Sequence, residues 1–116
     1  SEWSTREMAL NLDPAELQFA KEGGNVSVKI ISSSESRLAF KVKTSNNDLY
    51  RVRPVYGFVE PKADAPLVVV RFPGPPKDDK LVVQWAEVPA EETDPKAPFD
   101  AGAQQGEVML PMKPTY

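Results

Sequence analysis

The chain has 116 residues, a net charge of −3 and a sequence pI of about 5.0. This length suits one domain with a single core, and the acidic balance gives no general attraction for polyphosphate, so nucleic acid is not an expected partner. Cysteine and histidine are both absent, which removes disulfides, thiolate zinc sites and the Ser-His-Asp arrangement. We therefore expect a protein that is not an enzyme and that holds no cofactor or metal.

Apolar residues alternate with polar ones along most of the chain, whereas no long window keeps the spacing of an amphipathic helix. Pro14 is expected to end the first strand, since proline cannot donate to a ladder. Pro66 and Pro73 bound a run of β-branched residues that favours a buried strand. The segment 88–105 is rich in proline, alanine and acid and predicts a surface loop with one helical turn. The expected strands lie at residues 10–12, 17–19, 26–30, 38–42, 50–52, 67–72, 81–85 and 108–112.

Seven or so short strands separated by Gly, Pro, Ser or Asn are typical of an all-β fold, a two-sheet antiparallel sandwich. Residues 1–9 are expected to form an N-terminal tail and residues 10–116 the single domain. No run of apolar residues is long enough for a signal peptide or a membrane span, so we expect a cytoplasmic protein without membrane insertion. The centre of the core is expected at Phe40, Val52, Val69, Val83 and Trp85.

The segment from Phe40 to Pro54 carries four cations at alternate positions. The polar cluster at residues 45–48 predicts that the flanking strands either pair as a hairpin or pass between sheets. Alternation would point all four cations away from the apolar side, where they form either a solvated face balanced by nearby acids or a platform that steers an acidic segment onto the sheet. These cations are Lys41, Lys43, Arg51 and Arg53.

The acidic run from Glu91 to Asp94 also allows two interpretations. It is either a solvated loop or a ligand for the basic face of another copy, and the second contact would be heterologous and able to propagate. Open edge strands offer another mode of association, through their unpaired backbone groups.

Five motifs have the order and spacing of the major sperm protein (MSP) domain, and this resemblance extends from about Leu10 to Met112. Residues 73–80 and 86–107 are similar to small nematode sperm-specific proteins related to MSP. The resemblance implies a seven-stranded immunoglobulin-like, PapD-like antiparallel β-sandwich without catalysis. It also implies a place in the cytoskeleton of the sperm pseudopod, with MSP-family proteins or further copies of the chain as partners. The motifs are Leu12-Asp13-Pro14, 40–44, 50–54, 57–61 and 80–85.

More distantly, the chain resembles the MSP domain of VAMP-associated proteins, which binds acidic peptides called FFAT motifs on a basic sheet face. Residues 41–44 match that family's Lys-Val-Lys-Thr segment, and Lys80 matches the lysine of its Lys-Phe-Met-Val-Gln segment, although Val82 stands in place of methionine. The alternative function is therefore an adaptor that binds acidic FFAT-like peptides. The candidate protein-binding residues are Lys41, Lys43, Thr44, Arg51, Arg53, Lys80 and Val82.

Overall fold

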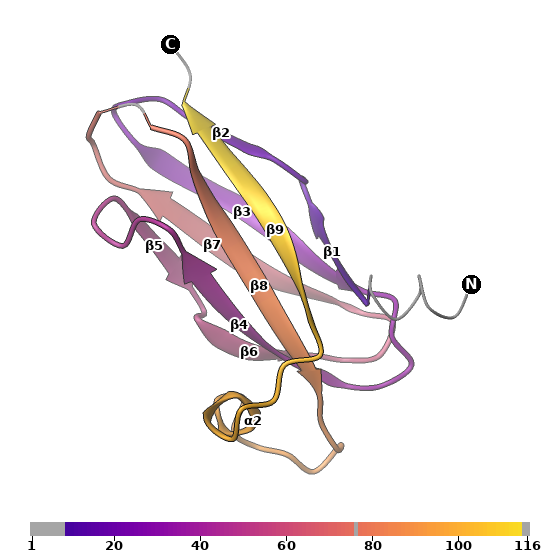
Figure 1. Ribbon diagram of the computed structural model, residues 1–116. Helices are drawn as coiled ribbons and strands as arrows, with labels where there is room; N and C mark the ends of the chain where they lie inside the picture. Colours follow the sequence, from indigo (N-terminus) through magenta and orange to yellow (C-terminus); the bar gives the residue numbers. More distant parts are fainter. Residues whose placement is uncertain (1–8, 76, 115–116) are drawn as a thin grey trace.

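The computed structural model, which describes residues 9–75 and 77–114, is a sandwich of two β-sheets (Figure 1). The four-stranded sheet has the order β1-β3-β7-β5, and the five-stranded sheet has the order β2-β9-β8-β4-β6. The elements are β1 (Leu10–Asp13), β2 (Leu17–Phe19), β3 (Gly24–Ser32), β4 (Leu38–Thr44), β5 (Tyr50–Arg53), β6 (Tyr56–Val59), β7 (Asp64–Arg71), β8 (Asp79–Glu87), the helical turn α2 (Ala97–Asp100) and β9 (Gly106–Pro114). The expected tail, residues 1–9, lies outside the described residues except for Ala9.

The predicted all-β sandwich is confirmed, but the described residues form nine strands and not seven. Strand β6 was not expected from alternation because Gly57 interrupts its apolar pattern. Strand β2 pairs with β9 in parallel, so the sandwich is not wholly antiparallel. Strand β7 also starts before Pro66. The proline is tolerated within the strand because β5 pairs only with residues 68–71, so no partner strand on that side needs a hydrogen bond from residue 66.

The chain passes from one sheet to the other between most consecutive strands, and two of these crossings matter most for the arrangement of charged side chains. Strands β1 and β2 belong to different sheets and are separated by the cis Asp13-Pro14 bond. Strands β4 and β5 also belong to different sheets, so the polar cluster at residues 45–48 is a crossing and not a hairpin turn. A second cis bond, Arg53-Pro54, lies between β5 and β6. These crossings decide which charged side chains share a face.

The centre of the core is a row of four residues that runs across the five-stranded sheet. Phe40 on β4 lies opposite Trp85 on β8, and each ring has a glycine on its other side, Gly57 on β6 and Gly106 on β9. A Cβ atom built on Gly57 would lie 2.6 Å from Phe40 Cζ, and one on Gly106 would lie 2.4 Å from Trp85 Cζ2. The two glycines therefore provide the space in which these large rings lie.

The expected core is confirmed at four of five positions, because Phe40, Val69, Val83 and Trp85 are all buried. Val52 was expected at the centre but is only partly buried, since β5 is the edge strand of its sheet. Its position at the edge makes Val52 available to line a groove.

Arg71 lies at one end of the core and is only 3% exposed, although it is a charged residue. The guanidinium group stands 5.8 Å from the centroid of the Tyr50 ring. It donates hydrogen bonds of 2.7 to 3.4 Å to backbone carbonyls, and so its hydrogen-bonding capacity is met without a carboxylate. The acceptors are the carbonyl groups of Ala20, Lys21, Phe72, Gly74 and Pro75.

Candidate protein-binding surfaces

The predicted cations do not form one platform. Lys41 and Lys43 project from the outer face of the five-stranded sheet, whereas Arg51 and Arg53 project from the outer face of the four-stranded sheet. The reason is the crossing between β4 and β5, which places strands adjacent in sequence in different sheets. The cations must therefore be treated as two surfaces with different neighbours.

The first surface, which we call the basic face, consists of Lys41, Lys43, Lys80, Val82 and Met109 on the five-stranded sheet. In the strand register Lys43 lies opposite Val82, and Val82 lies opposite Met109. Met109 is 51% exposed, and Lys43 and Lys80 are exposed as well. Within residues 9–75 and 77–114, none of the three lysines forms an ion pair. The basic face thus combines three lysines that form no ion pair with any described residue and an exposed apolar centre.

The orientation of Lys41 is influenced by an aromatic ring beside it. Its Nζ atom lies 5.6 Å from the centroid of the Tyr56 ring, which is within range of a cation–π attraction. Tyr56 in turn lies 6.0 Å from the ring of Phe99 on α2. The helical turn in the long loop therefore supports one side of the basic face.

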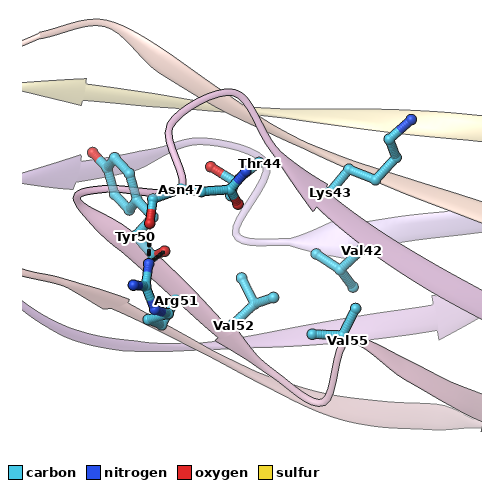
Figure 2. A pocket seen from close by; sticks show the side chains of 8 residues that line it. All are labelled: Val42, Lys43, Thr44, Asn47, Tyr50, Arg51, Val52 and Val55. Carbon is cyan, nitrogen blue, oxygen red and sulfur yellow. Dashed lines mark hydrogen bonds between the residues drawn. The ribbon is translucent and has the colours of Figure 1, made fainter.

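A groove lies next to the basic face, at the side of the sandwich where the chain crosses between sheets. Figure 2 shows the side chains of Val42, Val52 and Val55 gathered at its apolar part. Strand β6 pairs with β4 only as far as Lys41, so the end of β4 is not covered by a neighbouring strand there. The groove encloses about 290 Å³. Its remaining lining residues are Lys43, Thr44, Asn47, Tyr50 and Arg51.

The groove brings together three predicted residues from two sheets. Lys43 and Thr44 come from β4 and Arg51 comes from β5, while Arg53 is not among the lining residues. The Thr44 hydroxyl also accepts a hydrogen bond of 3.1 Å from the Asn46 backbone amide, so this side chain holds the crossing segment. Sequence reasoning missed both Val55 and Met109. Val55 lies between two strands, where alternation gives no signal, whereas alternation with Leu110 and Met112 could have placed Met109 on the outer face.

Tyr50 forms one wall of the groove and titrates abnormally. Burial raises the pKa of its hydroxyl above the usual value of 10.0, while the hydrogen bond and positive charge of Arg71 act in the opposite direction. The neutral phenol is thus the form favoured by the folded state.

We expect this shift to make the protein less stable in alkali. The unfolded chain releases the Tyr50 proton near pH 10 while the folded chain retains it, so stability is fully present below that pH and falls as pH rises through the folded pKa. Urea unfolding at pH 8 and pH 11 should show a smaller alkaline loss in Tyr50→Phe than in the wild type. Equal losses in the two proteins would contradict this assignment.

The acidic run from Glu91 to Asp94 is held in a defined loop at one end of the sandwich. Arg37 Nη1 donates to the carbonyl oxygen of Ala90 at 3.2 Å and to that of Glu92 at 2.7 Å, and its Nε atom forms an ion pair with Glu60 at 2.9 Å. The Glu92 carboxylate accepts hydrogen bonds from the next two backbone amides. Glu91 and Asp94 are exposed, so the loop presents negative charge on a fixed backbone.

Comparisons with known proteins show which family and which solved structures the chain is similar to. A family model described as the MSP (Major sperm protein) domain matches residues 9–108. The chain is 63% identical to sperm-specific class P protein 31 of Caenorhabditis elegans, over 89% of this chain and 96% of that protein. It is also similar to the solved structure of WR4, a C. elegans MSP family member, with 58% identity, a TM-score of 0.89, and coverage of 92% of this chain and 98% of that one.

A more distant structural likeness concerns the fold alone. The PapD-like domain 7 of human CEP192 aligns with a TM-score of 0.61 at 7% identity, covering 95% of this chain and 87% of that domain. The expectation of a PapD-like sandwich is thereby confirmed. In the part of the chain that the structure describes, no helix has the length and apolar character needed to cross a membrane.

Proposed function

Because this chain belongs to the MSP (major sperm protein) domain family, we propose that it is a non-enzymatic structural and interaction protein of nematode sperm. In this proposal it associates with other proteins of the MSP-based cytoskeleton, in the cytoplasm of the pseudopod that drives amoeboid movement. The similarity to sperm-specific class P proteins supports the cell type. The observation that carries the interaction role is the basic face, with its three lysines around an exposed apolar centre.

The chemistry of the basic face suits a protein partner with an acidic surface. Lys41, Lys43 and Lys80 provide a positive field that speeds and orients the approach of such a partner. Val82 and Met109 provide apolar area that loses contact with water when the surfaces meet, and methionine adapts its shape to different partners. Charge thus selects the partner and apolar contact retains it.

We expect reversal of two lysines to weaken this association. A Lys41→Glu/Lys43→Glu variant replaces attraction by repulsion, so co-sedimentation of the chain with filaments assembled from major sperm protein should fall about tenfold or more. The matched control is Lys21→Glu/Lys62→Glu, which makes the same change in net charge at exposed turns away from the basic face. Undiminished co-sedimentation of the first variant, at equal folded content by circular dichroism, would remove the basic face from the proposal.

A second candidate function is favoured by the groove beside the basic face. An acidic FFAT-like peptide lying along Lys43 and Lys80 would have the apolar groove within reach for one of its side chains, with Val42, Val52 and Val55 as its walls. In this role the chain is an adaptor that reads acidic peptides.

Peptide titration separates the two functions. If the chain is an adaptor, calorimetry should detect saturable binding of an FFAT-type peptide, and Lys80→Ala should weaken that binding about tenfold. Peptide binding without co-sedimentation favours the adaptor. Co-sedimentation without peptide binding favours the structural role.

A further inference from the structure

The second cationic surface lies on the outer face of the four-stranded sheet, in a different sheet from the basic face, and its Arg51 also lines the groove. We call it the arginine patch and define it as Arg51, Arg53, Val68, Val70 and Phe72. The first two side chains belong to the edge strand β5, where both are exposed, and they lie opposite Val70 and Val68 in the strand register. Phe72 follows directly after β7 and is 41% exposed. The patch is thus an apolar stripe bordered by two arginines.

Of the two arginines in the patch, Arg51 is held in place by hydrogen bonds. Arg51 Nη1 donates hydrogen bonds to the carbonyl oxygens of Asn47 and Tyr50, which leaves Nη2 and Nε for other acceptors. Its guanidinium carbon lies 5.5 Å from the centroid of the Phe72 ring. Neither Arg51 nor Arg53 forms an ion pair with any residue that the structure describes. A preorganised arginine beside an exposed aromatic ring is typical of protein interfaces.

The chain itself carries a segment of complementary chemistry, the acidic loop of residues 91–94. This loop has three carboxylates, those of Glu91, Glu92 and Asp94, next to apolar and proline residues. Its backbone is fixed by Arg37, so little ordering entropy would be lost on docking. Figure 1 shows the loop with α2 at the end of the sandwich opposite to the end of β7, so one molecule does not bring its own loop to its own patch.

We propose that the arginine patch docks the acidic loop of a second copy of this chain. The two surfaces are different parts of the molecule, so the contact is heterologous and leaves a free patch at one end of the pair and a free loop at the other. Copies therefore add head to tail. This inference rests on the proposed structural role, and it assigns self-association to a surface separate from the basic face.

A charge-swap experiment tests the contact in the full chain. Sedimentation velocity at low ionic strength should show association of the wild type that increases with concentration and weakens with added salt. Arg51→Glu/Arg53→Glu and Glu91→Lys/Glu92→Lys should each reduce the association constant at least about tenfold, because like charges then face each other. An equimolar mixture of the two variants should restore association, because each reversed surface meets a complementary one.

Three outcomes would overturn the proposal: a wild type that stays monomeric at millimolar concentration in low salt, variants that associate as the wild type does, or a mixture that restores nothing. The Lys41→Glu/Lys43→Glu variant distinguishes this contact from the basic face, because it should keep self-association while losing co-sedimentation with filaments. If that variant loses self-association and the arginine variant retains it, the contact lies on the basic face and the patch is excluded.

Discussion

A Trp85→Ala variant is expected to lose about 3–5 kcal/mol of unfolding free energy, the usual cost of deleting a large buried aromatic side chain. Trp85 is 1% exposed and lies at the centre of the row that crosses the five-stranded sheet, between Phe40 and Gly106. Its removal leaves a cavity that the neighbouring strands cannot close, because their ladders fix their separation. Urea unfolding followed by circular dichroism measures the loss as a lower midpoint.

The same row offers a test from the opposite direction. Gly106→Ala would place a methyl group 2.4 Å from Trp85 Cζ2, so the ring must move, and the cost should be about 1–3 kcal/mol even though the side chain is enlarged by only one carbon. Met109→Ala is the control on the same strand, because this side chain is 51% exposed and its loss should change stability by less than about 1 kcal/mol. A Gly106→Ala variant as stable as the wild type would show that the ring has other room.

The second large effect is expected at Arg71. An Arg71→Met variant keeps the length of the side chain but removes all five hydrogen bonds to backbone carbonyls. Since a hydrogen bond from a charged donor contributes about 1.5–3 kcal/mol, and water replaces some of the five, we expect an overall loss of about 3 kcal/mol or more. The midpoint of urea unfolding at pH 7 is the measurement.

A matched control separates the effect of burying the arginine from the effect of losing one positive charge. Arg53→Met makes the same chemical change on the neighbouring strand, at an exposed residue, and should alter stability by less than about 1 kcal/mol. Hydrogen exchange should also show that Arg71→Met loosens the segments around residues 20–21 and 72–75, which contain the five carbonyls that Arg71 binds. If the two variants unfold at the same urea concentration, the buried guanidinium is not what secures this end of the core.

Much of the fold follows from the sequence because alternation is a local property of a strand. Successive side chains point to opposite faces, so the burial of Phe40, Val69, Val83 and Trp85 and the exposure of Lys43 could be expected from spacing alone. Pro14 and the polar cluster at residues 45–48 likewise marked the places where ladder pairing stops. The motifs that resemble the MSP domain added the family, which the comparisons then confirmed.

The candidate surfaces needed the tertiary structure, since the partner of a strand is chosen by backbone pairing across distant parts of the chain. Local spacing put Lys43 and Arg51 on one charged segment, but pairing of β4 with β8 and of β5 with β7 moved them to different sheets. The same pairing brought Met109 beside Val82, and the crossing between sheets opened the groove.

Arg71 shows the limit of local reasoning most directly. In the sequence it is the one charged residue in the run between Pro66 and Pro73, yet in the fold its side chain is buried and bonds carbonyls from two separate turns. The sequence alone determined which face of each strand is apolar, because side-chain direction within a strand depends only on neighbouring residues in the chain. Which faces meet, and which charges stand together or are buried, was decided by contacts between residues far apart in that order.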